Sequence, residues 1–445
     1  MSQFTLLLSG RFLPLFCTQF LGALNDNVYK NALVIFIAFT LADRVGINSS
    51  ILVVIASGLF ILPFFLFSAT AGQIADKYEK AFLIRRIKLA EILIMCLAAV
   101  GFLLQSLGLL MVVLFLMGTQ STFFGPLKYG ILPQHLDVNE LIGGNGMIQM
   151  GTYLAILVGT IIGGVLIAMQ DAGIFLVSAT VILLALAGWG SSRYIPPAAA
   201  AAETLALDWN IIRQTWLIIR YALEDRGIFI IIIAISWFWF IGATFLSLVP
   251  GYTRDVLSGN ELVATLLLFA FSVGIGSGSL FCEKLSRSRI EPGLVPIGAL
   301  GLTIFPLDLF LVGTPELAGG VLIGPAYFLQ SWSHLRILLD LVMIGLCGGL
   351  YIVPLYAMVQ HRSSPGHRAR IIAAANILNA LFMVLSALIV MALIKLAIGL
   401  TNVFLVVAVL NIFVAGIVFI MSSEFVIACY SLFRSWTGQR CLDDV

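Results

Sequence analysis

Charged side chains are scarce in this chain. Asp, Glu, Lys and Arg together make up 10% of its 445 residues, and 61% of the residues are hydrophobic. Soluble globular domains carry about 25% charged residues, so this composition excludes that class and predicts a polytopic α-helical membrane protein. The net charge of +2 gives no reason to expect a nucleic-acid partner.

Motifs for catalysis and for cofactor binding are missing. The chain has no P-loop, no H-E-x-x-H and no G-x-S-x-G, and its six cysteines occur singly, without a C-x-x-C pair. Gly274, Gly276 and Gly278 lie inside an apolar segment, where close helix packing is favoured over a dinucleotide loop. We therefore expect a protein that is not an enzyme and that carries no cofactor or metal site.

Long apolar runs, separated by short polar turns, are what the chain does contain. They predict an all-α membrane protein of twelve transmembrane helices. The predicted segments are 12–41, 50–75, 82–104, 107–130, 141–169, 172–194, 228–254, 261–283, 292–313, 335–360, 369–397 and 400–425.

The segments form two sets of six on either side of the longest polar interval. This predicts an N-terminal six-helix bundle at 1–192, a cytoplasmic linker at 193–227, a C-terminal bundle at 228–425 and a cytoplasmic tail at 426–445. Apolar residues recur at helical spacing in the linker, which predicts an amphipathic helix on the membrane surface. They are Trp209, Ile212, Trp216, Ile219 and Leu223.

The distribution of Lys and Arg predicts the orientation. With the N-terminus in the cytoplasm, eighteen of the 24 fall on the cytoplasmic side, Lys88 among them. The positive-inside rule then places both termini in the cytoplasm, and the first segment, which does not look like a signal peptide, is expected to be a retained span. The residues predicted on the opposite side are Arg44, Arg254, Arg336 and Lys395.

The two sets of helices echo each other in sequence. Pro126–Gln134 ends the fourth segment and Asn145 opens the fifth, while Pro354–Gln360, with Tyr356, ends the tenth and Asn376 lies early in the eleventh. This shared order predicts two pseudo-symmetric halves, with a substrate site near the bilayer midplane where they meet. Asn145, Tyr356 and Asn376 are included among the candidate substrate-binding residues.

The first segment carries the main polar cluster. At about 100° per residue, Gln19, Asp26 and Lys30 share one face of a helix, with Asn27 beside it. Asp26 lies near the predicted midplane, where an ionised residue costs roughly 2.5–3.5 kcal/mol, so this face is expected to meet an aqueous cavity, a ligand or charges on other helices. The alternative is that Asp26 and Lys30, four residues apart, only neutralise each other.

The turn after the second segment resembles the corresponding loop of the major facilitator superfamily, which reads approximately G-x-L-A-D-R-x-G-R-K. A short glycine turn would let the Asp76 carboxylate reach the N-terminus of a neighbouring helix and nearby cations, closing the cytoplasmic side. Glu79 and Ala81 depart from the pattern. We assign gating roles to matching residues of this loop, namely Gly72, Asp76, Lys77 and Lys80.

Three runs that occur together sharpen this resemblance. The chain resembles the bacterial lysophospholipid transporter family of that superfamily. The resemblance is carried by the runs Phe20–Asn27, Gly72–Asp76 and Gly125–Leu132, together with Val353–Leu355. The resemblance implies alternating-access movement of lysophospholipids, especially lysophosphatidylethanolamine, to the cytoplasmic leaflet of the bacterial inner membrane for re-acylation. Some relatives carry acyltransferase and acyl-carrier-protein synthetase domains, so separate enzymes of that kind are expected functional partners of a monomeric transporter.

The same resemblance places Asp26 and Lys128 at charged positions of the family's central cavity and gate. The seventh helix departs from the family pattern. Family members have an arginine shortly after a G-A-T run, whereas Gly242–Thr244 is followed here by Phe245 and Leu246. Lys30 is our candidate for the missing cation.

A lysophospholipid needs partners for its phosphate, its amine and its acyl chain. Asp26 could hold an ammonium group, and Lys30 and Lys128 a phosphate. Glu91 is a weaker candidate, because Lys88 could pair with it. The aromatic residues of the seventh segment could line the acyl-chain path or simply pack, and the acidic residues of the ninth and tenth segments are expected to be hydrated near the external ends. These residues are Trp237, Phe238, Trp239, Phe240 and Phe245, and Asp308 and Asp340.

Two other functions fit the same sequence. One is a proton-coupled exporter of drugs or small amphiphiles, with Asp26 as the proton carrier. The other is a non-transporting membrane anchor or receptor for lipid-remodelling enzymes. Coupling to Na⁺, to H⁺ or to the lipid gradient alone stays open.

Overall fold

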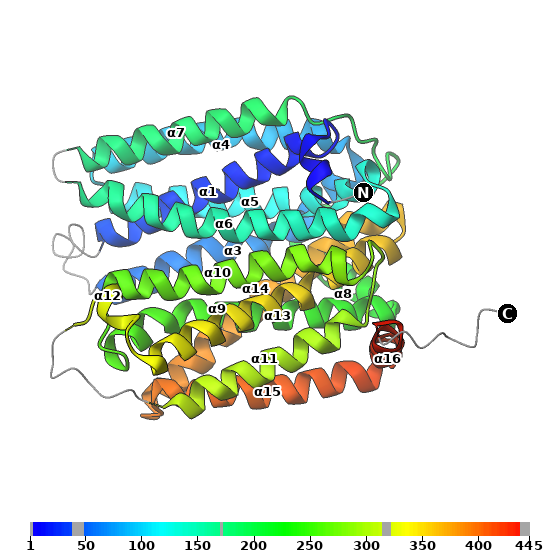
Figure 1. Ribbon diagram of the computed structural model, residues 1–445. Helices are drawn as coiled ribbons and strands as arrows, with labels where there is room; N and C mark the ends of the chain where they lie inside the picture. The colour runs from blue at the N-terminus through cyan, green and yellow to red at the C-terminus, as the bar shows by residue number, and fades with distance from the viewer. Residues whose placement is uncertain (1–2, 38–48, 170–171, 314–321, 437–445) are drawn as a thin grey trace. The chain divides into compact units, whose positions relative to one another are not determined.

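The computed structural model describes residues 3–37, 49–169, 172–313 and 322–436, and these residues are mainly helical, with no β-strand among them (Figure 1). Each of the twelve predicted segments coincides with a long α-helix. These helices are α1 (Leu13–Phe36), α3 (Ser49–Lys77), α4 (Lys80–Leu103), α5 (Leu107–His135), α6 (Leu141–Ala168), α7 (Gly173–Ser192), α9 (Arg226–Asp255), α10 (Glu261–Leu285), α11 (Leu294–Val312), α13 (Trp332–Arg362), α14 (Arg368–Lys395) and α15 (Leu400–Met421).

Shorter helices lie between and after the long ones. The linker helix that the apolar spacing predicts is present as α8 (Ile211–Glu224), and the predicted tail contains α16 (Glu424–Trp436). Arg44, Arg440 and Cys441 lie outside the described residues. The remaining short elements are η1 (Gln3–Leu8), η3 (Val138–Glu140), α12 (Pro325–Phe328) and η4 (Pro365–His367).

Ten of the helices are long and apolar enough to cross a membrane. The prediction of a multi-pass membrane protein is therefore confirmed, while twelve as the number of spans stays a prediction. Polar side chains reduce the apolar character of the other two predicted spans, α1 and α4. They are Asn25, Asp26, Asn27, Lys30 and Asn31 in α1, and Arg85, Arg86, Lys88 and Glu91 in α4.

Side-chain caps start several helices directly after very short turns. Ser106, Asp225 and Asn260 each accept a hydrogen bond from the backbone N–H three residues later, at the starts of α5, α9 and α10. Glu79 caps α4 by accepting from the N–H groups of Ala81 and Phe82, at 2.8 and 2.6 Å. Each cap satisfies backbone donors that have no partner within the helix, so a turn of a few residues is enough.

The chain divides into two compact units, which are described separately. The first unit comprises Met1–Asp137, Gly151–Glu224 and Gln360–Ala380, and the second comprises Val138–Met150, Asp225–Val359 and Leu381–Val445. Helices α6, α13 and α14 contribute to both units. The predicted bundles at 1–192 and 228–425 stay a prediction.

In the first unit, α4 packs between α5 and α7, and α1 packs against α7 (Figure 1). Their shared core contains the fully buried side chains of Tyr29, Met95 and Phe102. The Tyr29 hydroxyl donates to the Leu110 carbonyl oxygen at 2.8 Å, which satisfies the polar end of an otherwise apolar residue. This core fixes α1, the helix that carries the polar cluster.

In the second unit, glycines bring α10 and α13 into backbone contact. A Cβ atom added to Gly274 or Gly278 would overlap the carbonyl oxygen of Val342 or Leu346, respectively. Gly345 lies in the same contact from the α13 side. The interpretation of these glycines as helix-packing residues is therefore confirmed.

Replacing Gly278 by alanine is expected to lower the thermal stability of the purified protein, because a methyl group forced against a backbone oxygen costs about 1–3 kcal/mol. Gly416→Ala in α15 is the matched control, since its Cβ would meet nothing within 4 Å. Unfolding temperatures in detergent measure both variants. Equal stability of the two would show that the α10–α13 contact adjusts without cost.

Candidate functional site

The polar face of α1 is partly open and partly sealed. Asp26, Asn27 and Lys30 are partly exposed, whereas Gln19 is buried, with its Oε1 accepting from the Thr152 hydroxyl at 3.2 Å. The first three residues therefore keep part of this polar face accessible, with charge at Asp26 and Lys30. The expectation that Gln19 shares this access is wrong, because α6 covers that end of the face.

Asp26 and Lys30 have different partners. The Asp26 carboxylate accepts from the Ser121 hydroxyl at 2.8 Å, and the Lys30 ammonium lies over the Phe60 ring, 4.4 Å from its centroid. No ion pair joins Asp26 to Lys30 among the described residues. Both charges therefore keep hydrogen-bonding capacity that a ligand can use. They are still close enough to attract each other, so the alternative of mutual neutralisation stays open.

A second pair of charges is buried beside this face. Lys88 and Glu91, 1% and 2% exposed, form an ion pair at 2.6 Å within α4. The Glu91 carboxylate also accepts from the side-chain amides of Asn25 and Gln120, each at 3.0 Å. Gly22 makes this possible, because a Cβ there would overlap the Lys88 ammonium.

This pair confirms one prediction and corrects another. Glu91 does pair with Lys88, as expected, so it is a structural carboxylate rather than a free one. The count of Lys88 among the cytoplasmic cations is wrong, because its ammonium is enclosed by α1, α4 and α5. The sequence signal was available, since Lys88 and Glu91 stand one helical turn apart inside an apolar run.

Hydrogen bonds through α5 connect the carboxylates of Asp26 and Glu91. Gln120 bonds Glu91, and its neighbour Ser121 bonds Asp26, with the Ser121 hydroxyl also 3.2 Å from the Gln120 amide oxygen. Sequence reasoning missed Asn25, Gln120 and Ser121. Uncharged polar residues in an apolar helix gave no indication of which face would meet the charges.

Lys128 lies farther along α5. It is partly exposed, and its ammonium lies 4.5 Å from the centroid of the adjacent Tyr129 ring. Among the described residues it has no anionic partner, and it is close enough to Lys88 for the two ammonium groups to interact. A cation without a paired acid at this position favours an anionic ligand.

The remaining predicted binding residues are distributed over both units. Asn376 belongs to the first unit, where its amide nitrogen faces Gly125. Asn145 and Tyr356 belong to the second unit, where Asn145 donates to the Leu141 carbonyl of its own helix at 2.9 Å and Tyr356 accepts from Trp239 at 3.1 Å. The structure therefore groups only Asn376 with the α1 residues in one unit.

The aromatic residues of α9 mostly pack. Trp237, Phe238 and Phe240 are at most 4% exposed, and the Trp237 indole donates to Asn411 at 2.8 Å. A role for these rings in lining an acyl-chain path is therefore not supported. Phe245 is buried too, whereas Trp239 is partly exposed.

The acidic residues near the predicted external ends also differ from each other. Asp308 is partly exposed and pairs with Arg336, with 2.9 Å from Nε to the carboxylate. The expectation of a hydrated Asp340 is wrong, because it is 2% exposed.

Asp76 makes the contacts that the loop resemblance leads us to expect, while its gating role stays a prediction. Its fully buried carboxylate accepts from the backbone N–H groups of Ala369 and Arg370, at 3.0 and 3.3 Å, and from Arg370 Nε at 3.0 Å. These donors form the first turn of α14, so the carboxylate meets both a helix N-terminus and a cation. We call these contacts the Asp76 latch.

Gly72 contributes to the latch in a different way than predicted. It lies inside α3 rather than in a turn, and only Tyr78 and Glu79 separate α3 from α4. A Cβ on Gly72 would lie 2.8 Å from the Ala373 Cβ, so glycine allows α14 to approach α3 closely.

The two lysines of the predicted gate are unlike each other. Lys77 is partly exposed and lies over the Tyr78 ring, 5.8 Å from its centroid. Lys80 is 2% exposed, and its ammonium has no hydrogen-bond partner among the described residues. Neither lysine bonds to Asp76, so Arg370 is the latch cation that sequence reasoning missed.

The linker before α8 forms hydrogen bonds with the turn between α3 and α4. The N–H groups of Ala201 and Ala202 donate to the Asp76 carbonyl, both at 2.9 Å. Ala198 donates to the Glu79 carboxylate at 2.7 Å and accepts from the Lys80 N–H at 3.0 Å. Glu79, a departure from the superfamily pattern, thus ties the linker to the start of α4.

Replacing Asp76 by asparagine is expected to destabilise the protein by about 1.5–3 kcal/mol, because a neutral amide cannot replace a charged acceptor of three hydrogen bonds. Glu261→Gln, an exposed carboxylate in the first turn of α10, is the control and is expected to change little. Thermal unfolding in detergent compares the two. A similar small shift in both would remove the energetic role of the latch.

Sequence comparison finds curated proteins that are similar to this chain. The chain is 27% identical over 365 residues to the lysophospholipid transporter LplT of Serratia proteamaculans (strain 568), covering 80% of this chain and 81% of that protein. It is also 27% identical over 367 residues to the LplT of Yersinia pestis (strain Pestoides F), covering 80% of each.

Solved structures show the same fold. The human organic anion transporter MFSD10 (TETRAN) superposes with a TM-score of 0.68 at 14% identity, covering 91% of this chain and 98% of that one. A bacterial homologue of the iron transporter ferroportin, in an outward-facing state, gives 0.59 at 15% identity, covering 95% and 99%. The model of the Major Facilitator Superfamily matches residues 15–329. Because this match covers well over half of the 445 residues, the chain belongs to the Major Facilitator Superfamily.

Proposed function

We propose that this chain is a lysophospholipid transporter that moves its substrate to the cytoplasmic leaflet of a bacterial inner membrane for re-acylation. The observation that carries the proposal is the set of partly exposed charges Asp26, Lys30 and Lys128, none of which forms an ion pair among the described residues. The names of the Serratia and Yersinia relatives support the substrate class. The family and these relatives indicate a transporter rather than an enzyme.

The charges match the substrate head group. A lysophosphatidylethanolamine head carries an ammonium and a phosphate. Asp26 would accept hydrogen bonds from the ammonium, and Lys30 and Lys128 would bind the phosphate. Asn27 and Asn376 would add neutral hydrogen bonds in the same unit, and we keep Asn145 and Tyr356 as candidate contributions of the second unit.

Alternating access gives the Asp76 latch its role. We propose two six-helix bundles, at 1–192 and 228–425, that rock about a midplane site, with both termini in the cytoplasm and the latch holding the cytoplasmic side closed. The simplest assembly is a monomer that needs no cofactor and delivers lysophospholipid to a separate cytoplasmic acyltransferase. Na⁺ and H⁺ are the coupling ions to be tested.

Uptake of labelled lysophosphatidylethanolamine into proteoliposomes tests the proposal. We expect leaflet-resolved uptake clearly faster than in protein-free liposomes, and inhibition by unlabelled lysolipid but not by diacyl lipid. Uptake no faster than in empty liposomes would remove the proposal. Transport of a hydrophobic cation that stops when the pH gradient collapses, without competition by lysolipid, would instead favour a proton-coupled exporter.

A further inference from the structure

Helix α8 has an outer face that nothing in its own unit covers. Ile212 and Trp216 are 84% and 66% exposed, and Trp209, just before the helix, is 67% exposed. On the opposite side, Ile218 and Ala222 are 5% and 2% exposed, because they pack onto the first unit. An apolar stripe that points away from the protein needs an apolar partner.

We propose that α8 lies in the plane of the bilayer surface, with Ile212 and Trp216 inserted among the lipids, and that from this position it clamps the Asp76 latch. The proposal goes beyond the transport function and does not depend on which substrate is carried.

The position of α8 in the chain selects a phospholipid surface as the partner. Helix α8 ends at Glu224 and the membrane-spanning α9 begins at Arg226. A separation of two residues spans at most about 7 Å, so the end of α8 stays at the edge of the membrane. An apolar stripe held there meets lipid before it meets a soluble protein.

The polar residues beside the stripe fit phospholipid head groups. Arg213 pairs with Asp208 at 3.5 Å, and Arg220 with Glu224 at 3.9 Å, and all of these side chains are partly or largely exposed. Such exposed pairs are weak, so the guanidinium groups are free to bind lipid phosphates. The tryptophans suit the same depth, because indole rings favour the membrane–water interface.

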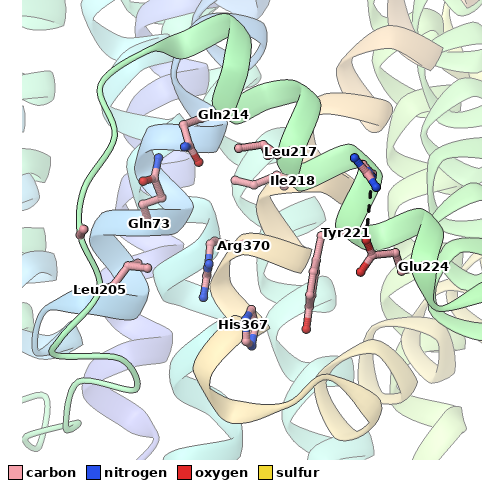
Figure 2. A pocket seen from close by; sticks show the side chains of 11 residues that line it. Gln73, Leu205, Gln214, Leu217, Ile218, Tyr221, Glu224, His367 and Arg370 are labelled. Atoms are coloured by element: carbon pink, nitrogen blue, oxygen red, sulfur yellow. Dashed lines mark ion pairs between the residues drawn. The ribbon is translucent and has the colours of Figure 1, made fainter.

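On its inner side, α8 contacts both sides of the Asp76 latch. At the α3 side, Gln73 exchanges two hydrogen bonds, at 3.2 and 3.1 Å, with the backbone of Asp208, three residues before α8 begins. The Asp208 carboxylate in turn accepts from the Gln214 side chain of α8 at 2.9 Å. At the α14 side, the Tyr221 ring stacks on His367, with 4.6 Å between centroids. Figure 2 shows Tyr221 reaching from α8 toward His367. Both residues line a pocket of about 340 Å³.

The two contacts together make α8 a clamp. Asp76 lies one helical turn after Gln73, and Ala369, which it binds, lies two residues after His367. If α14 leaves α3, either the hydrogen bonds between Asp208 and Gln73 or the stacking of Tyr221 on His367 must break. Lipid bound to the outer face holds α8 in the position that satisfies both.

Spin-label accessibility in nanodiscs tests the membrane position. A label is placed at Ile212→Cys, or at Glu224→Cys on the polar side as the matched control, in the full chain with its native cysteines replaced. We expect the ratio of oxygen to nickel-chelate collision rates to be several-fold higher at position 212 than at position 224. Equal ratios would mean that the stripe faces water, and protection of position 212 from both reagents would mean that protein covers it; either result overturns the proposal.

Cross-linking in the same nanodiscs tests the clamp. Tyr221→Cys and His367→Cys together are expected to react with a short bismaleimide in high yield. Adding Ile212→Gln and Trp216→Gln is expected to lower this yield severalfold, whereas adding Glu203→Gln, at an exposed residue of the linker before α8, is not. An unchanged yield in the Ile212→Gln, Trp216→Gln protein would overturn the clamp even where the accessibility result stands.

Discussion

Replacing Lys88 by methionine is expected to lower the stability of the protein by about 3–5 kcal/mol, the usual cost of removing one partner of a buried ion pair. Lys88 and Glu91 are almost completely enclosed, at 1% and 2% exposed, so water cannot replace the lost ammonium. Glu91 would keep its hydrogen bonds from Asn25 and Gln120, which compensate only part of a buried charge. Unfolding in detergent, followed by temperature or denaturant, measures the loss.

A double variant separates the charge effect from packing. Lys88→Met together with Glu91→Gln removes both charges and keeps a side-chain acceptor for the two amides. It is expected to recover most of the lost stability, because neutral replacements of buried pairs are often tolerated. Lys284→Met, at an exposed lysine in the last turn of α10, is the control for losing a lysine. A double variant as unstable as Lys88→Met would show that the pair acts through shape rather than charge.

Replacing Asp26 by asparagine is expected to slow lysophosphatidylethanolamine uptake by about 10- to 100-fold. A hydrogen bond to a charged group contributes about 1.5–3 kcal/mol, and each 1.4 kcal/mol corresponds to a factor of ten. Asparagine keeps the size of the side chain and can still accept from Ser121, so folding is expected to be intact. Initial uptake rates in proteoliposomes, at matched protein content, give the result.

The control for Asp26 is a carboxylate with a different environment. Asp308→Asn in α11 removes a charge that pairs with Arg336 and is expected to leave uptake near the wild-type rate. Matching unfolding temperatures for the wild type, Asp26→Asn and Asp308→Asn would confirm that each protein is folded. Normal uptake by the Asp26→Asn protein would exclude this carboxylate as the ammonium partner.

Most of the helices could be predicted because their signal is local. In an apolar chain, a helix satisfies its own backbone hydrogen bonds, so composition and turn residues are enough to locate it. The one clear error of this kind concerns Gly72, which we expected in a turn. The residues after Gly72 are turn-like, but the turn needs only Tyr78 and Glu79, because Glu79 caps the start of α4. Helix α3 therefore continues as far as Lys77.

The candidate site was predicted less completely. Helical spacing put Asp26 and Lys30 on one face of α1, where both are partly exposed, because residues four apart share a face in any helix. Their binding roles stay a prediction. Gln19 shares that face, but Thr152 of another helix covers it. The assignment of Lys88 to the cytoplasm failed for the same reason, since only packing decides whether a lysine near a helix end reaches water or enters the bundle.

The sequence by itself determined that this protein is a helical membrane transporter, because hydrophobic length, charge distribution and motif spacing are properties of the chain alone. Only the tertiary structure decided which charges are paired and which remain accessible. Lys88 is neutralised by Glu91, Asp76 by Arg370 and the start of α14, whereas Asp26, Lys30 and Lys128 keep free capacity. The physical reason is that the cost of a charge depends on the groups within a few ångströms of it, and those groups come from helices far apart in the sequence.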